Sequence, residues 1–184
     1  EAELSDQYTL KKVEILGGGL EYIYIPGKQN LPTLVMLHEG LGSISTWKEF
    51  PKQVSNTVNN PILLYSRHGY GSSSFIKQRF CSSYMHDEAL KVLPALISRL
   101  QLDRIILYGH SDGASIAAIF AGSKPTTIIE GVILEAPHVF VEEISIEGIE
   151  LAKLAFENGK LKRGLKKHHD CLLYTSPSPR DGLL

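Results

Sequence analysis

Cysteine is scarce in this chain, and long apolar runs are missing from it. The 184 residues include two cysteines, Cys81 and Cys171, which cannot form a disulfide framework and lack the spacing of a metal site. No stretch approaches the roughly 18 consecutive apolar residues of a membrane-spanning helix. These absences exclude a disulfide-stapled domain and a membrane span, and we expect no metal and no membrane partner.

An excess of charge of either sign is also missing. The formal net charge is -1, and acidic and basic residues are mixed along the chain, so we expect no nucleic-acid partner. The one basic run, residues 160–167, is expected to be a solvated helix face rather than a docking patch. The first residues have no signal-peptide pattern and no initiator methionine, and a cytoplasmic location is expected.

What the sequence does contain is a regular order of apolar runs and amphipathic segments. Two β-type runs at 11–16 and 20–25, separated by three glycines, predict an antiparallel hairpin. Further strands are predicted at 33–37, 61–65, 103–108 and 128–134, and helices at 46–58, 85–100 and 113–121. Because these later strands are continuous apolar runs, we expect an α/β three-layer sandwich with a mostly parallel sheet flanked by helices.

The last part of the chain breaks this alternation. Residues 142–169 are helical in pattern and charged, and no strand follows them, which predicts the start of a helical lid. Residues 171–184 have no periodicity and resemble translated sequencing adapter, with a natural disordered tail as the alternative. We therefore expect a core over 1–141, the start of a helical cap over 142–170 and a non-native tail over 171–184.

The residues Gly109-His110-Ser111-Asp112-Gly113 fit the G-x-S-x-G pattern of a nucleophile elbow. A predicted strand leads into them and a helix of small residues leaves them, which is the context that the pattern requires. Ser111 would then have a strained backbone and a hydroxyl at a helix N-terminus, where developing negative charge is favoured. We expect Ser111 to be a nucleophile, and the alternative is a serine that caps a helix in another α/β protein.

A serine nucleophile needs an oxyanion hole, and two segments can supply it. One donor is the backbone N–H of Asp112, and the other should come from the turn after the strand at 33–37. Gly40 is the first choice there and Leu41 the next. Losing one such donor typically costs about 3 kcal/mol of transition-state stabilisation. His38, in the same turn, is expected to hold the turn by local hydrogen bonds rather than to act as a base.

Three turns, in this order, resemble those of the α/β-hydrolase fold family: His38-Glu39-Gly40-Leu41-Gly42, Arg67-His68-Gly69-Tyr70-Gly71-Ser72 and Gly109-His110-Ser111-Asp112-Gly113. The resemblance covers roughly residues 8–170. It implies a hydrolase with a serine nucleophile, a small-molecule substrate and no cofactor. The middle turn is then a structural turn beside the site, with His68 as a variation. Glu39 departs from the glycine that usually follows the first histidine of the family.

The partners of the serine are harder to find. A serine hydroxyl needs a histidine to take its proton and a carboxylate to orient that histidine, and the family order is serine, acid, histidine. Glu135 is the candidate acid. His138 is expected to lie at the pocket or lid entry rather than to act as the base. His110 should point away from the hydroxyl. His168 and His169 are expected to belong to a charged tail end.

In the family the histidine normally follows the last strand of the sheet, and no residue after Ser111 fills that role convincingly. We therefore expect a C-terminally truncated reading frame that is inactive or nearly so. A sheet without its last strands would also have an unpaired edge and exposed apolar surface, so poor solubility is expected.

Three functions compete. The first is a serine hydrolase acting on an ester-like bond. The second keeps the fold and the serine but performs acyl transfer or perhydrolysis, whereas epoxide and carbon–halogen hydrolysis are disfavoured because a serine ether could not be hydrolysed onward. The third is a ligand-binding receptor without turnover. A nucleotide-binding function is excluded, because the glycines at 17–19 open no helix and no phosphate-binding motif follows a strand.

Overall fold

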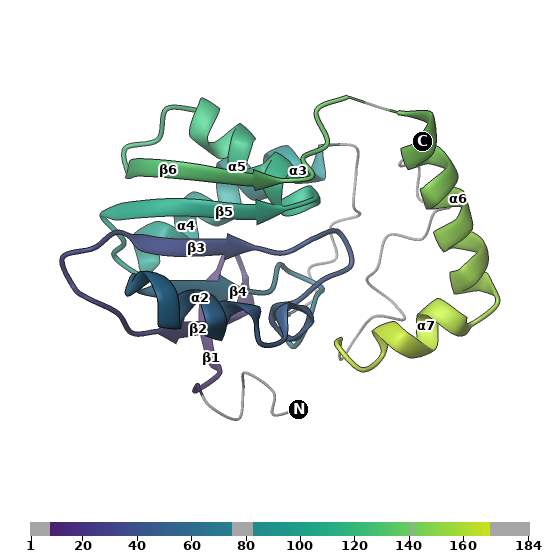
Figure 1. Cartoon of the computed structure of the whole chain (residues 1–184), viewed down its shortest axis with the longest axis horizontal. Helices are drawn as coiled ribbons and strands as arrows, with labels where there is room; N and C mark the ends of the chain where they lie inside the picture. Colours follow the sequence, from purple (N-terminus) through teal and green to yellow (C-terminus); the bar gives the residue numbers. More distant parts are fainter. Residues whose placement is uncertain (1–7, 75–82, 141, 170–184) are drawn as a thin grey trace.

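Six strands form one mixed sheet in a computed structural model that describes residues 8–74, 83–140 and 142–169 (Figure 1). The strands are β1 (Lys11–Ile15), β2 (Gly18–Ile25), β3 (Thr33–Leu37), β4 (Ile62–Tyr65), β5 (Arg104–His110) and β6 (Ile128–Glu135). Their order across the sheet is β1-β2-β4-β3-β5-β6. The hairpin β1-β2 is antiparallel and β2 joins β4 antiparallel, while β4, β3, β5 and β6 run parallel. The predicted fold class is confirmed.

Helices connect the strands on both sides of the sheet, and two further helices follow the last strand, β6. They are η1 (Ile44–Trp47), α2 (Phe50–Val58), α3 (Tyr84–Asp87), the π-helical turn η2 (Glu88–Val92), α4 (Leu93–Arg99), α5 (Asp112–Gly122), α6 (Glu143–Glu157) and α7 (Lys160–Leu165). The prediction of a single helix over 46–58 is wrong. Lys48 has a φ of 50° and ends η1, and α2 starts afresh with Pro51 in its first turn.

The predicted helix over 85–100 exists, but its middle is a π-helical turn. Pro94 follows this turn. Proline has no N–H to donate to the carbonyl of Leu90, and its ring crowds that carbonyl, so a wider turn relieves the conflict. The helical path therefore continues through η2 into α4 and still covers one face of the sheet.

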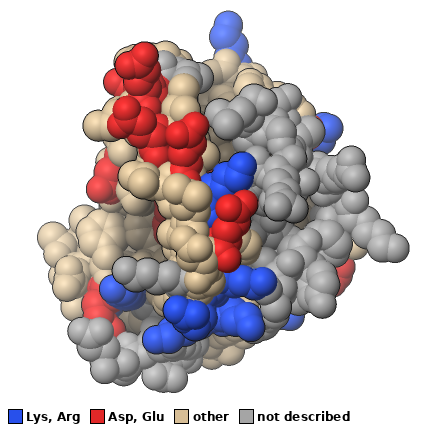
Figure 2. All heavy atoms as spheres, turned by 90° about the vertical axis from the view of Figure 1, so that its right-hand side faces the viewer, with Lys and Arg blue, Asp and Glu red and all other residues tan. Residues whose placement is uncertain are grey.

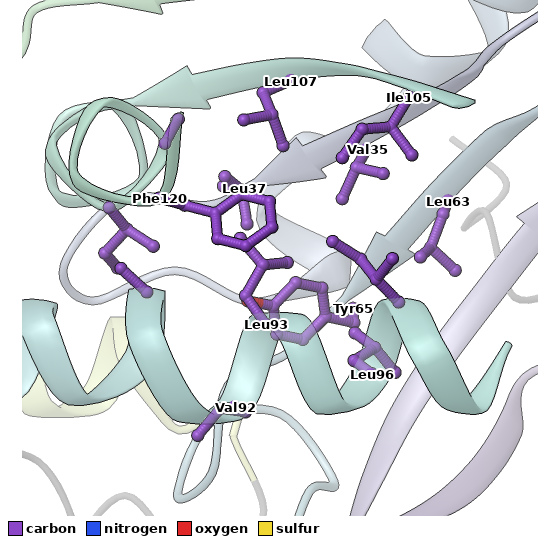
Figure 3. Packing of buried hydrophobic residues seen from close by; sticks show 14 of the residues in the cluster. Val35, Leu37, Leu63, Tyr65, Val92, Leu93, Leu96, Ile105, Leu107 and Phe120 are labelled. Carbon is purple, nitrogen blue, oxygen red and sulfur yellow. The ribbon is translucent and has the colours of Figure 1, made fainter. Parts of the chain in front are cut away.

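Alternation along the strands builds a core on each face. Val35 and Leu37 pack with α4 and α5 on one side, as Figure 3 shows for Leu93, Leu96 and Phe120. On the other side Leu34 and Met36 contact the layer that contains Ile44, Trp47 and Val54. Burying one such aliphatic side chain contributes about 1.5–3 kcal/mol. The two clusters make the three-layer arrangement that the sequence predicted.

The edge strand β6 is an exception to this burial. Ile128 is 57% exposed, Ile133 49% and Leu134 40%. Among the described strands β6 pairs only with β5, and α5 packs beside it. The apolar sequence of β6 therefore predicts a strand correctly. In the part of the chain that the structure describes, however, β6 is not buried in the way that such an apolar run usually is. The expected apolar edge is observed.

The helices α6 and α7 lie apart from the sheet, beyond the carboxyl ends of its parallel strands (Figure 1). Figure 2 shows carboxylates gathered over α6 and basic side chains over α7. The basic residues Arg163, Lys166 and Lys167 are exposed, in line with the predicted solvated face. The division into core and cap stays a prediction, and the tail at 171–184 lies outside the described residues. Within the described ranges, no helix has the length and apolar character needed to cross a membrane.

Candidate active site

Ser111 stands at the sharp turn between β5 and α5. Its φ is 54° and its ψ is -117°, a conformation that non-glycine residues rarely adopt, so the predicted backbone strain is present. The Ser111 N–H donates to the carbonyl of Glu135 at 2.8 Å, which ties the turn to β6. A Cβ on Gly109 would lie 2.3 Å from the Gly113 carbonyl oxygen, and one on Gly113 would lie 2.0 Å from that of Leu37. Both glycines therefore permit the close crossing of strand and helix.

The hydroxyl of Ser111 has a histidine partner in the structure. Ser111 Oγ lies 2.8 Å from Nε2 of His138, which follows β6. The backbone N–H of His138 donates to Ser115 Oγ at 2.9 Å, so α5 also anchors this histidine. This contact differs from the expectation that His138 lies at the pocket or lid entry and is not the base. The parallel pairing of His110 with Glu135 explains the contact, because it brings the residues just after β6 beside the elbow.

A carboxylate lies next to this pair. Asp112 Oδ1 is 3.5 Å from His138 Nε2, and the Asp112 side chain is 14% exposed. The hydroxyl of Tyr84, in α3, donates a short hydrogen bond to Asp112 Oδ2. Burial, together with the neighbouring Asp112 charge, raises the pKa of Tyr84, so this hydroxyl keeps its proton. Sequence reasoning missed Tyr84, which lies far from the motif along the chain.

Glu135, the predicted acid, is placed differently. Its carboxylate accepts a short hydrogen bond from the hydroxyl of Tyr108, and burial with this contact raises the pKa of Tyr108 to about 12. Among the described residues, no ion pair joins Glu135 to a histidine. The structure thus brings Glu135 to the elbow through its main-chain carbonyl and brings Asp112, not Glu135, to His138.

The turn after β3 lies against the elbow, as the oxyanion prediction requires. A Cβ on Gly40 would be 2.8 Å from Asp112 Oδ2, so the glycine lets the two turns approach closely without displacing the Asp112 side chain. The Gly42 N–H donates to the Glu39 carbonyl at 3.1 Å and closes the turn. Asp112 is the first residue of α5, where a backbone N–H has no partner within the helix. Gly40, Leu41 and Asp112 therefore stay the candidate donors.

His38 is buried and holds this turn. Its Nδ1 donates to the Glu39 carbonyl at 2.8 Å and its Nε2 accepts from the Arg67 N–H at 3.1 Å. The Arg67 guanidinium donates to the carbonyls of His38 and Glu39, at 2.6 and 2.8 Å. Burial, and then the charge of Arg67, holds the pKa of His38 well below its usual value, so its ring is neutral. The expected local role of His38 is confirmed.

The middle turn is structural, as the resemblance implied. Gly71 has a φ of 55°, and a Cβ there would lie 1.9 Å from Glu21 Oε1. Ser73 Oγ accepts from the Glu21 N–H at 2.9 Å and donates to the Ser66 carbonyl at 2.7 Å. The variant residue His68 packs its ring over Gly18 of β2, where a Cβ would approach Cε1 of the ring to 3.1 Å. These contacts lock the turn after β4 onto the hairpin.

The reading of His168 and His169 as a tail end is wrong. Nδ1 of His168 lies 2.8 Å from Ser45 Oγ, and His169 is 5% exposed with both ring nitrogens hydrogen-bonded. The helical pattern of the preceding segment gave no sign that its end folds back onto the loops after β3 and β4. His110, in contrast, directs its Nδ1 toward Glu39, 3.9 Å from Oε2.

The described residues contain no group of three or more histidine, cysteine, aspartate or glutamate side chains that could hold a metal ion. A hollow of about 650 Å³ is lined by Ile97, Gln101, Asp103 and Thr127, among others. It lies where the chain enters β5 and β6, at the opposite end of these strands from Ser111. The elbow is therefore the candidate site.

Comparison with known proteins assigns the family. A family model described as alpha/beta hydrolase fold matches residues 32–180. The chain belongs to the α/β-hydrolase fold family. Known relatives of this chain include a proline iminopeptidase from Lactobacillus crispatus, 32% identical over 62% of the chain, and a protein phosphatase methylesterase 1 from Candida albicans, 26% identical over 90%. The chain spans 39% of the first relative and 46% of the second.

Solved structures agree on the fold of this α/β-hydrolase. A hydrolase from Pseudomonas aeruginosa superposes with a TM-score of 0.65 at 18% identity, over 95% of this chain and 71% of the other. A carboxylesterase from Bacillus subtilis gives 0.63 at 18% identity, over 79% and 50%. At this level of identity the likeness concerns the fold, and the chemistry has to be argued from the site itself.

Proposed function

We propose that Ser111 is the nucleophile of a serine hydrolase that cleaves an ester-like bond of a small-molecule substrate. The observation that carries the proposal is the 2.8 Å contact between Ser111 Oγ and His138 Nε2 within a strained elbow. A general base must lie within about 2.6–3.2 Å of the oxygen atom whose proton it takes. The names of relatives, an iminopeptidase and a methylesterase, support acyl chemistry on an amide or ester.

The described residues supply a sequence of steps. Ser111 Oγ attacks the substrate carbonyl carbon while His138 Nε2 takes the hydroxyl proton. The carbonyl oxygen becomes an oxyanion that the N–H groups of Asp112 and of Gly40 or Leu41 can bind. His138 then gives the proton to the leaving alcohol, and an acyl-serine forms. Water attacks this ester in the second half, with His138 again taking a proton, and the carboxylic acid leaves.

The carboxylate of Asp112 supports the charge on His138 in these steps. At 3.5 Å from Nε2 it stabilises the imidazolium that forms when Ser111 is deprotonated. The short hydrogen bond from Tyr84 holds the carboxylate in place. Glu135, the acid predicted from the sequence, contributes through its carbonyl contact to the Ser111 N–H. Asp112 is therefore the carboxylate that we propose to act with His138.

Acylation of the serine tests the proposal without requiring full turnover. The 184-residue chain is mixed with a p-nitrophenyl ester, and release of p-nitrophenol is measured together with the intact mass of the protein. We expect one acyl group on Ser111 and none in the Ser111→Ala variant. Acylation should be unchanged in the control variant Ser123→Ala, because Ser123 lies at the other end of α5, where its hydroxyl donates to the Phe120 carbonyl. His138→Ala should slow acylation by at least about 10²-fold, whereas His110→Ala should not.

Equal acylation in the wild type and Ser111→Ala would overturn the assignment of the nucleophile. Equal acylation in the wild type and His138→Ala would overturn the assignment of the base. Adding an alcohol acceptor distinguishes hydrolysis from acyl transfer, because a transferase forms the new ester in preference to the free acid.

A further inference from the structure

His169 connects two turns of the site through one imidazole ring. It follows α7 and is 5% exposed. Its Nδ1 accepts a hydrogen bond from the Gly71 N–H at 2.9 Å, and its Nε2 donates to the Leu41 carbonyl at 2.9 Å. This pair of contacts requires the neutral ring with its proton on Nε2. The turn after β4 and the turn after β3 are thereby tied together by a residue of the helical segment.

The contact at Leu41 falls on the turn that would bind the oxyanion. Gly40 and Gly42 flank Leu41 and give this stretch wide backbone freedom. On one side, His38 and Arg67 fix the carbonyls of residues 38 and 39. On the other side, the His169 bond fixes the peptide that follows Leu41. Oxyanion donors act only when they are held in place before the reaction.

The neighbouring histidine strengthens this attachment. Nδ1 of His168 lies 2.8 Å from Ser45 Oγ, and the His168 carbonyl accepts from Ser43 Oγ at 3.2 Å. The ring of Tyr70 packs edge-on against His169 at 5.7 Å. The end of the α6–α7 segment is thus docked onto residues 41–45, next to the elbow.

We propose that His169 is a positioning residue that makes the shape of the oxyanion turn depend on docking of the α6–α7 segment. The inference rests on the proposed function of Ser111. When the segment is docked, the Leu41–Gly42 peptide is fixed, and the turn that carries Gly40 and Leu41 lies against Asp112 of the elbow. When it is undocked, the glycines on both sides let the turn rotate away. The helical segment then controls how well the transition state is bound.

The test separates binding of the ester from its reaction. His169→Phe keeps the ring shape and removes both hydrogen bonds, and His169→Gln restores a donor that can reach Leu41. We expect His169→Phe to lower the acylation rate constant of Ser111 by on the order of 10- to 100-fold, with the dissociation constant of the ester within about twofold. His169→Gln should recover a large part of the rate. His86→Phe is the control, because His86 is exposed on α3.

Amide hydrogen exchange at Gly71 gives a second measurement that does not depend on activity. It should be faster in His169→Phe than in the wild type and unchanged in His86→Phe. Wild-type acylation rates in His169→Phe, with Ser111 still reactive, would overturn the inference and leave the proposed function standing. A wild-type chain whose Ser111 is never acylated would overturn the proposed function and this inference with it.

Discussion

The glycines of the elbow show how a single side chain decides whether the site forms. An added Cβ on Gly113 would sit 2.0 Å from the Leu37 carbonyl oxygen, which belongs to rigid sheet backbone. We expect Gly113→Ala to lower the free energy of unfolding by about 3 kcal/mol or more, because strand and helix must separate. Urea unfolding monitored by circular dichroism measures this.

Gly122 is the matched control, since it ends the same helix and a Cβ there meets nothing within 4 Å. Gly122→Ala should stabilise the protein by about 0.5–1 kcal/mol, because alanine has less conformational entropy to lose than glycine when the chain folds. Similar effects of the two substitutions would contradict the packing argument.

Burial of His38 makes the stability of the fold depend on pH. Its pKa in the folded protein lies well below the usual 6.5, mainly because the ring is desolvated. The unfolded chain therefore binds a proton that the folded chain excludes, and stability falls as the pH drops through about 6.5 toward the folded-state value. We expect the free energy of unfolding to fall between about pH 7.5 and about pH 5.5.

In His38→Gln this decrease should be smaller than in the wild type, even though the variant is less stable at neutral pH. The exposed His86 supplies the control, and His86→Gln should keep the wild-type decrease. A decrease of equal size in all three proteins would show that His38 is not the group responsible.

At this scale the sequence predicts residues that belong to a local motif. The five-residue motif and the strand before it predict Ser111, Gly109 and Gly113, because the backbone geometry of the turn requires these residue types locally. His138 and Tyr84 do not, since their contacts arise only when β6 pairs with β5 and α3 packs near α5. Nothing in the local pattern around either residue indicates which side chain it will meet.

Elements were predictable where one physical signal dominates. The strand β3 has the predicted bounds of 33–37, because a continuous apolar run between turn residues has few other uses in a parallel sheet. The prediction of one helix over 46–58 was wrong because the spacing of apolar residues carries no information about the φ of 50° at Lys48, which ends η1. The π turn before Pro94 was missed for a similar reason, as the apolar face continues through it.

The π turn carries a buried acid that joins the helix to the sheet. Glu88 accepts a hydrogen bond from the Tyr65 hydroxyl at 2.7 Å, and both residues are buried. Removing the donor leaves the carboxyl group short of a partner, so Tyr65→Phe should cost about 1–3 kcal/mol of stability. Denaturant unfolding is the measurement, with Tyr24→Phe as the control.

Tyr24 is 39% exposed, and its substitution should change stability by less than about 0.5 kcal/mol. If Tyr65→Phe were as harmless as Tyr24→Phe, the hydrogen bond to Glu88 would not be what joins β4 to η2.

The topology of the whole sheet explains why turns distant in sequence share one site. β3, β4 and β5 are parallel neighbours, so the segments that follow them emerge at the same edge of the sheet. His38, Arg67 and Ser111 each come directly or almost directly after one of these strands. The alternation of strands and helices was visible in the sequence, and this edge could be predicted from it. The return of His169 to the same edge could not, because it depends on how a helical segment packs in three dimensions.

The exposed face of β6 leads to a prediction about the molecule as a whole. Ile133 is 49% exposed and Val132 39%, on a strand at the edge of the sheet. Exposed apolar edge strands pair with other chains. We expect the 184-residue chain to self-associate at micromolar concentration. The substitution Ile133→Lys should shift the chain toward monomer, because a charged edge strand resists pairing. The aliphatic stem of the lysine still covers the sheet. Sedimentation velocity measures the size distribution.

Leu10→Lys is the control, because Leu10 is 40% exposed and lies just before β1, away from β6. This substitution should leave association unchanged. If Leu10→Lys and Ile133→Lys dissociated the protein equally, the contact between chains would lie elsewhere than on β6.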